Sequence, residues 1–178
     1  MNVYVALLRG VNVGPKKRIR MEPLRELVRG LGFADVRTLV NSGNVVFRGE
    51  GETAGIARQL ELALHDTHGL DVDVVVRTAD EMAEVVAANP FPDIVATPKL
   101  LHVSFLATPL PEATRQAIEG LDTGDDRVVM RDREVYLHAP HGLSGTSPAI
   151  QALGRTLTVV STSRNWNTVT RLTEMARS

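Results

Sequence analysis

Cysteine is absent from all 178 residues of the chain. Disulfide bonds, iron–sulfur clusters and zinc sites with thiolate ligands are therefore excluded, and a cytoplasmic location is the default expectation. Aromatic residues make up only 4% of the sequence, which argues against a surface that stacks the bases of single-stranded nucleic acid. No apolar run approaches the roughly 18 residues of a membrane span, and the N-terminus lacks the pattern of a signal peptide. We therefore expect no membrane partner.

Charge is distributed unevenly along a chain whose net charge is only −1. Residues 1–48 contain nine Lys or Arg and three Asp or Glu, a net charge of +6, whereas residues 49–178 carry −7. This asymmetry indicates an anionic partner for the N-terminal half or contact between the halves. A solvated basic face would give the same pattern.

An apolar strand at residues 3–8 leads into a glycine-rich basic loop. Gly10 and Gly14 allow unusual backbone angles, and four cations follow within five residues. Backbone N–H groups in such a loop, beside the start of a helix, can bind an anion. The glycine spacing is not that of a P-loop, and a flexible, solvated crossover is the alternative. The predicted ligand-binding residues of this loop are Arg9, Asn12, Lys16, Lys17 and Arg18.

Apolar periodicity and turn residues predict the elements of the first half. After the first strand, the expected order is a helix at 21–31, strands at 36–40 and 44–48, a helix that Thr53 caps and that runs to about 68, and a strand at 72–77. A helix at 79–88 follows. Two prolines in Asn89-Pro-Phe-Pro-Asp93 exclude a helix or a central strand there. We therefore take residues 90–99 as the connector between two halves.

The second half repeats the same order of elements. It is expected to contain strands at 100–106, 127–131, 134–138 and 156–160, and helices at 111–119, 147–154 and 165–176. Ser147 should cap the middle helix, with Pro148 in its first position.

Both halves follow the order strand–helix–strand–strand–helix–strand, which is typical of ferredoxin-like domains. The predicted fold class is α+β, with tandem ferredoxin-like halves at 1–89 and 100–178 and a terminal helix. Strands such as Val74-Val-Val76 and Val128-Val-Met130 are apolar on both faces. Their second face should be covered by the other half or by a second chain in a homo-oligomer.

Asn41-Ser-Gly-Asn44 is interpreted as a hairpin turn and as a second candidate site. Ser42 and Asn44 are candidate ligand-binding residues if this turn meets the basic loop. Turn chemistry by itself also explains Asn and Gly at these positions.

A third polar segment, Ser161 to Thr168, precedes the last helix. Ser163 or Asn165 can cap that helix, and the N–H groups that follow would then favour an anion. The alternative is a well-capped helix that is anchored by the only tryptophan. The candidate ligand-binding residues of this segment are Arg164, Asn165 and Asn167.

No pattern in the sequence predicts a metal site, a cofactor or a catalytic group. His65/His68 and His138/His141 have the spacing i, i+3, but neither pair has a clearly placed third ligand. Ser42 lacks a nearby base and the nucleophile-elbow pattern.

Four segments together resemble a widespread bacterial family described only as domain of unknown function 1697. They are Tyr4-Val-Ala-Leu-Leu-Arg-Gly-Val-Asn-Val-Gly14, Asn41-Ser-Gly-Asn-Val-Val-Phe47, Asn89-Pro-Phe-Pro92 and Arg164-Asn-Trp-Asn-Thr168. The resemblance implies two tandem ferredoxin-like halves and no established activity. Family members often carry Gln where this chain has Asn41, and a Lys near residues 144–148 that this chain lacks.

The leading hypothesis is a binding protein for a phosphate-bearing small molecule, a nucleotide or a nucleic-acid backbone, with salt-sensitive affinity. One alternative is a small acylphosphatase-like hydrolase in which Arg9 and Asn44 would hold the phosphate, by analogy of fold. The other is a structural or oligomerising protein.

Overall fold

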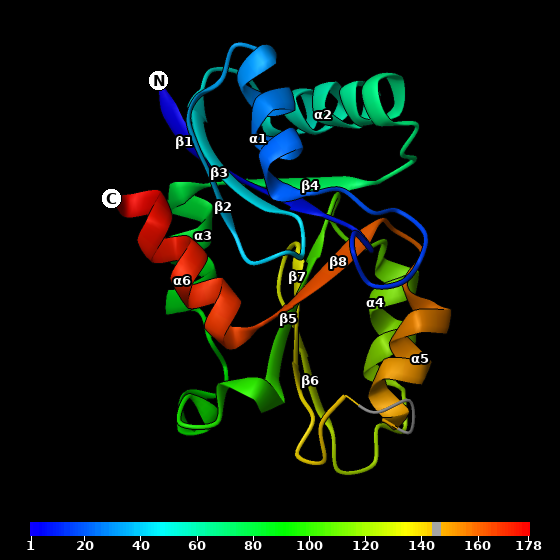
Figure 1. Ribbon diagram of the computed structural model, residues 1–178. Coiled ribbons are helices and arrows are strands. Elements are labelled where there is room, and N and C mark those ends of the chain that lie inside the picture. Colours follow the sequence, from blue (N-terminus) through cyan, green and yellow to red (C-terminus); the bar gives the residue numbers. More distant parts are fainter. Residues whose placement is uncertain (144–146) are drawn as a thin grey trace. The chain divides into compact units, whose positions relative to one another are not determined.

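The structure is a computed structural model that describes residues 1–143 and 147–178 (Figure 1). Within these residues the fold is α+β, with two four-stranded antiparallel sheets and six α-helices. The chain divides into two compact units, Met1–Val86 with Thr170–Ser178, and Ala87–Val169. The last helix therefore begins in the second unit and ends in the first, whereas the sequence had assigned it wholly to the second half.

The first unit contains the predicted series of elements. In chain order these are β1 (Asn2–Leu8), α1 (Met21–Gly30), β2 (Ala34–Leu39), β3 (Asn44–Gly49), α2 (Thr53–His68), β4 (Val74–Thr78) and α3 (Ala79–Ala87). The strand order is β2-β3-β1-β4, and β1 is antiparallel to both of its neighbours. β1 is therefore an inner strand, and the basic loop begins where β1 ends, between the ends of the strands on either side.

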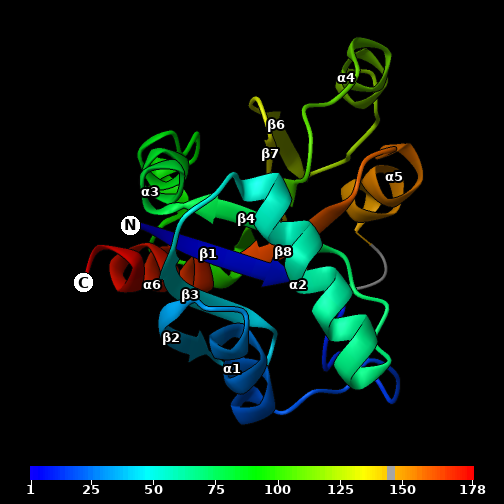
Figure 2. The same cartoon turned by 90° about the horizontal axis from the view of Figure 1, so that it is seen from above.

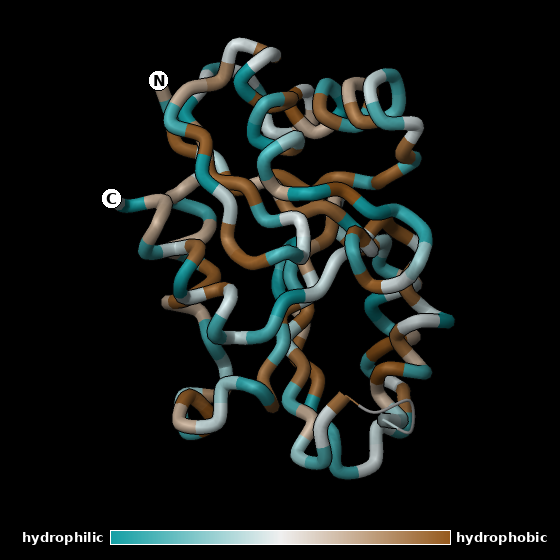
Figure 3. The backbone as a smooth tube through the Cα atoms, viewed as in Figure 1, coloured by the Kyte–Doolittle hydropathy of each residue, from teal (hydrophilic) through white to brown (hydrophobic). Residues whose placement is uncertain are grey.

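The core of the first unit explains why these segments form regular structure. Tyr4 and Leu8 of β1 lie in one apolar cluster with Leu24 of α1 and Leu60 of α2. Figures 1 and 2 show α1 and α2 side by side on one face of this sheet. In Figure 3 much of β1 and β4 is brown, whereas teal, white and brown stretches alternate along the loop after β1. Leu7, on the other face of β1, is also fully buried, as the unbroken apolar run predicts.

The second unit repeats the strand arrangement with one difference from the prediction. Its elements are η1 (Pro92–Ile94), η2 (Pro98–Leu100), β5 (Leu101–Leu106), α4 (Glu112–Glu119), β6 (Arg127–Met130), β7 (Glu134–His138), α5 (Pro148–Thr156), β8 (Ser161–Asn165) and the start of α6 (Trp166–Arg177). The strand order is β6-β7-β5-β8.

The predicted strand at 156–160 is wrong, because the strand that pairs with β5 is Ser161–Asn165. Leu157 and Val159 suggested a strand by their β-propensity, but they pack against the apolar cluster around Leu106 instead. The residues that pair with β5 are the polar ones that follow, Ser161–Asn165.

The connector packs closely within the second unit. Phe91 is buried, and the Arg127 guanidinium lies 4.7 Å from the centroid of its ring. Arg127 also approaches Asp93, with Nη2 and Oδ2 3.6 Å apart. Asn89 Oδ1 accepts a hydrogen bond of 3.0 Å from the Phe91 N–H. This segment is therefore a docked strap rather than a loose linker.

Candidate anion-binding site

Asn12 organises the basic loop between β1 and α1. Its backbone has a φ of 59°, and its Oδ1 accepts a 3.0 Å hydrogen bond from the Ile19 N–H. Its Nδ2 donates to the carbonyl oxygens of Ile19 at 2.8 Å and of Asn41 at 2.7 Å. Both amide hydrogens are thus engaged within the protein. Asn12 therefore positions the loop instead of presenting its amide to a ligand.

The turn between β2 and β3 lies against this loop. Besides the Asn12–Asn41 bond, the Leu8 N–H donates to the Gly43 carbonyl at 2.9 Å. Gly43 has a φ of +70°, and a Cβ added there would lie 2.8 Å from the Leu8 Cβ and 3.3 Å from the Val11 Cβ. Only glycine fits this close approach without a shift of buried side chains. The first two predicted polar segments therefore meet in space.

A cavity of about 640 Å³ opens beside this junction and the start of α1. Three of the side chains that line it are basic or can become so: Arg18, Arg20 and His68. Among the described residues no carboxylate lines this cavity, and none of its arginines forms an ion pair. The lining is Asn12, Arg18, Ile19, Arg20, Met21, Pro23, Asn41 and His68.

The N-terminus of α1 contributes to this cavity through Met21 and Pro23 of its first turn. Arg20 is the N-cap residue and offers no side-chain hydrogen bond to the first-turn N–H groups. Glu22 is the acidic residue of that turn, but Arg25 and Arg29 hold its carboxylate and lower its pKa. Pro23 has no N–H and the Leu24 N–H donates to the Arg20 carbonyl, so the N–H groups of Met21 and Glu22 are the ones that the first turn can offer to an anion, together with the positive end of the helix dipole.

The other predicted cations of the loop lie outside the cavity. Arg9 forms an ion pair with Asp73, with Nη1 and Oδ2 3.1 Å apart. Lys17 lines a neighbouring cavity of about 460 Å³ that also contains Asp73 and other carboxylates. Lys16 is exposed. Of the predicted loop residues, Asn12 and Arg18 reach the cavity, and Arg20, Asn41 and His68 join them without having been predicted.

Ser42 and Asn44 shape the turn. Asn44 is fully buried, and its Nδ2 donates to the Leu39 carbonyl at 3.0 Å and to the Ser42 Oγ at 2.9 Å. These bonds match the reading in which turn chemistry explains both residues. The acylphosphatase-like pair gains no support from this geometry, because Arg9 is engaged with Asp73 and Asn44 is buried.

The third polar segment forms β8 and the start of α6 in the second unit. Arg164 is buried, and its Nη1 donates at 2.8 Å to both the Thr162 Oγ1 and the Ser163 carbonyl. Burial lowers the pKa of Arg164 to about 10. Asn165 Oδ1 accepts a 2.9 Å bond from the Thr168 N–H, so the predicted cap on the last helix is confirmed. Asn167 is exposed on α6.

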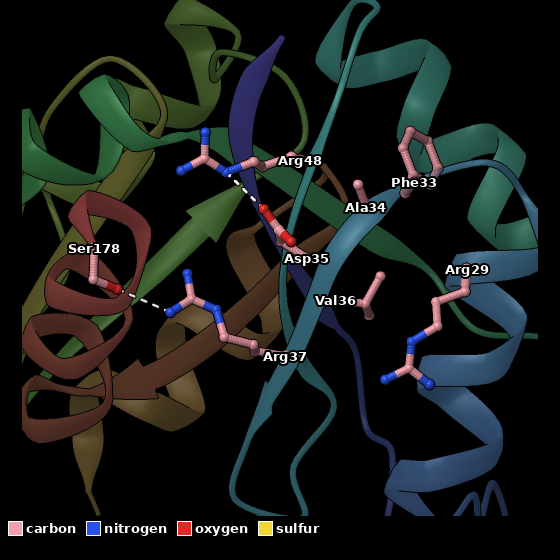
Figure 4. A pocket seen from close by; sticks show the side chains of 8 residues that line it. All are labelled: Arg29, Phe33, Ala34, Asp35, Val36, Arg37, Arg48 and Ser178. Carbon is pink, nitrogen blue, oxygen red and sulfur yellow. Dashed lines mark hydrogen bonds and ion pairs between the residues drawn. The ribbon is translucent and has the colours of Figure 1, made fainter.

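A larger cavity, about 690 Å³, lies beside β2 (Figure 4). It is lined by three arginines, each of which already has a partner. Arg48 pairs with Asp35 at 3.0 Å, and Arg37 donates to the Ser178 Oγ at 2.9 Å. Arg29 lies 3.4 Å from Glu22, which is outside the cavity lining. The three arginines of this cavity are therefore less available to a ligand than Arg18 and Arg20.

At the start of α5, in the second unit, a carboxylate of the protein itself accepts the hydrogen bonds that a bound anion would otherwise accept. Ser147 is the N-cap of α5, as predicted, and its Oγ accepts a 3.3 Å bond from the Ile150 N–H. Asp126 Oδ2 accepts bonds from the Ser147 hydroxyl at 2.6 Å and from the Ala149 N–H at 3.2 Å. The loop that lacks the family's lysine includes residues 144–146, which lie outside the described residues.

His102 on β5 gives the chain a testable acid sensitivity. Burial lowers its pKa from the ordinary 6.5 to about 4, and its buried Nδ1 has no hydrogen-bond partner among the described residues. Between these two pH values His102 binds a proton in the unfolded chain but not in the folded one. The contribution of the neutral ring to the free energy of unfolding is therefore fully present above pH 6.5 and is lost as the pH falls toward 4. Because the ring is partly exposed, we expect this loss to be about 1–2 kcal/mol.

Urea denaturation at pH 7 and at about pH 4.5 measures this loss in the wild type and in His102→Leu, since the two share all their carboxylates. The stability difference between the two pH values should be smaller in His102→Leu. An equal difference in both proteins would contradict the assignment to His102.

No group of three or more His, Asp or Glu in the described residues is placed to hold a metal ion. None of the described helices has the length and apolar character that crossing a membrane requires.

Comparisons with known proteins identify a family and a fold. A family model with the description "Protein of unknown function (DUF1697)" matches residues 1–136. The conserved bacterial protein SP0830 from Streptococcus pneumoniae has a similar structure, with a TM-score of 0.77, 21% identity and 98% of each chain covered. At that identity the likeness shows the fold alone. The acetolactate synthase small subunit from Thermotoga maritima is 14% identical over 93% of this chain and 97% of its own, but the TM-score of 0.24 is too low to indicate a shared fold. No functionally curated protein matches the sequence.

Proposed function

The chain belongs to the DUF1697 family of proteins of unknown function, and we propose that it binds a phosphate-bearing anion in the cavity beside the start of α1. One observation carries the proposal. The uncapped first turn of α1 opens into a cavity whose charged lining, among the described residues, is wholly basic.

The chemistry of this lining suits a phosphate group. A guanidinium can donate two parallel hydrogen bonds to phosphate oxygens, so Arg18 and Arg20 can hold the ligand by charge-assisted contacts. Arg18 Nε already donates to the Gly14 carbonyl at 3.1 Å, which restrains the side chain over the loop. The N–H groups of the first turn add fixed donors. His68 can donate from the end of α2.

The lining also indicates which part of a ligand is recognised. Among the described residues it contains no Phe, Tyr or Trp, so His68 is the only ring in the lining on which a nucleobase could stack. We therefore infer recognition of a phosphate monoester, a diphosphate or a nucleic-acid backbone, with any base of a nucleotide left outside the contacts.

Isothermal titration with inorganic pyrophosphate at low salt tests the proposal. Arg18→Gln and Arg20→Gln should each weaken binding by about tenfold, because each removes one charge-assisted hydrogen bond. Binding by the wild type should weaken as salt is added. Arg155→Gln is the matched control, since Arg155 is an exposed arginine that does not line the cavity.

Equal affinity in all four proteins would remove this cavity from the proposal. An absence of any binding by the wild type at low salt would remove the proposal itself.

We further infer that both units are ferredoxin-like, since each combines the order strand–helix–strand–strand–helix–strand with a four-stranded antiparallel sheet. Cytoplasmic location, homo-oligomer formation and the hydrolase alternative stay predictions. Turnover of an acyl phosphate, compared between the wild type and Arg9→Ala, tests the hydrolase alternative.

A further inference from the structure

Two exposed valines flank the contact that joins the basic loop to the turn after β2. Val13 is 82% exposed and follows Asn12, and Val40 is 54% exposed and precedes Asn41. The Asn12 side chain donates to the Asn41 carbonyl at 2.7 Å. Single exposed apolar residues are common on protein surfaces. These two differ because they lie on segments that are hydrogen-bonded to each other at the border of a basic cavity.

Exposed cations follow Val13 in the same loop. Lys16, Lys17, Arg18 and Arg20 all belong to the loop, and none forms an ion pair with another described residue. Exposed apolar side chains beside a loop whose cations form no ion pair suit the surface of an anionic bilayer. The apolar groups enter the boundary between headgroups and acyl chains, and the cations face the lipid phosphates.

A nucleic-acid backbone fits these observations less well. Contact with a solvated phosphate backbone gains nothing from exposed valines. Among the described residues, the cavity lining also has no Phe, Tyr or Trp, and His68 is its only ring that could stack on a base.

We propose that the exposed residues of the basic loop, together with Val40 and Asn41 of the turn, form a membrane-contact surface for an anionic phospholipid bilayer, with a lipid phosphate held in the basic cavity. This inference depends on the proposed function, because the lipid headgroup supplies the phosphate-bearing anion. The expectation of no membrane partner, which came from the lengths of apolar runs, is the competing outcome of the test below.

Co-sedimentation with vesicles tests the surface. The wild type should bind phosphatidylcholine vesicles that contain phosphatidylglycerol, should not bind phosphatidylcholine alone, and should dissociate as salt is added. Lys16→Gln should weaken binding by about fivefold. Val13→Thr and Val40→Asn should each weaken it by about three- to tenfold, because a polar side chain gains less from leaving water.

Val40→Asn separates membrane contact from folding. Val40 has a φ of 50°, which a β-branched residue adopts only with strain and which asparagine tolerates. The variant should therefore keep or raise the melting temperature while it binds vesicles less well. Val95→Thr is the matched control for Val13→Thr, because Val95 is exposed at η1 of the second unit and should not change binding.

The results separate this inference from the function on which it depends. Pyrophosphate binding without vesicle binding overturns the membrane surface and leaves the proposed function intact. Vesicle binding that the valine substitutions do not change overturns the apolar contact. Tighter binding to a single-stranded oligonucleotide than to anionic vesicles, at matched phosphate concentration, overturns the bilayer in favour of nucleic acid.

Discussion

Replacement of Gly43 with alanine should lower the free energy of unfolding by about 3 kcal/mol. The φ of +70° at this position costs an L-residue about 1–2 kcal/mol, and the new Cβ would lie 2.8 Å from the Leu8 Cβ. Leu8 and Val11 are both only 1% exposed, so neither can move aside without disturbing the core. Urea denaturation followed by far-UV circular dichroism measures the loss.

Gly69→Ala separates the two causes of this loss. Gly69 ends α2 with a φ of 62°, but an added Cβ there meets no atom within 4 Å. We expect it to cost about 1 kcal/mol, from the backbone alone. If Gly43→Ala costs no more than Gly69→Ala, the close approach of the turn to Leu8 is not rigid.

Gly43→Ala should also weaken pyrophosphate binding. A shift of the turn away from Leu8 would move Asn41, which belongs to the turn and lines the cavity.

Replacement of Phe91 with alanine should lower stability by about 3–4 kcal/mol. Phe91 is only 4% exposed, although it lies in the proline-containing segment that the sequence predicts to be a connector between the two halves. Its ring lies under the Arg127 guanidinium and 6.1 Å from the ring of His138, between centroids. The substitution would leave a cavity and remove the ring over which the Arg127 guanidinium lies. Trp166, the only tryptophan, belongs to the same unit and reports its unfolding by fluorescence.

Phe91→Leu is the matched variant, because it keeps much of the apolar volume and removes the cation–π contact. It should cost about 1–1.5 kcal/mol. Stability of Phe91→Ala within about 0.5 kcal/mol of the wild type would mean that the segment is a loose linker after all.

Elements specified by local chemistry could be predicted from the sequence. Helix α2 ends at His68, as its apolar stripe and the glycine that follows predict, although Thr53 is its first residue and Glu52, not Thr53, is its N-cap. The Ser147 cap and the β7 strand Glu134–His138 were likewise predicted at their residues. In each case the signal lies within a few neighbouring residues, through periodicity, a cap or a tight turn.

Strand β8 could not be predicted in the same way. Leu157 and Val159 have stronger β-propensity than Ser161 to Asn165, yet the latter form the ladder with β5. Pairing with a strand about 60 residues earlier decides the register, and the apolar pair is used to cover α4 and α5 instead.

The candidate site shows the same division between local and distant information. By itself the sequence determined the charge of the N-terminal half, the glycine loop and the helix that follows. Only the tertiary structure decided which polar groups remain available, since it engages the amides of Asn12 and Asn44 and buries Arg164, while it brings His68 and Arg18 to the same cavity. The physical reason is that a side chain binds a ligand only if no partner from a distant part of the chain has already satisfied its hydrogen bonds and charge.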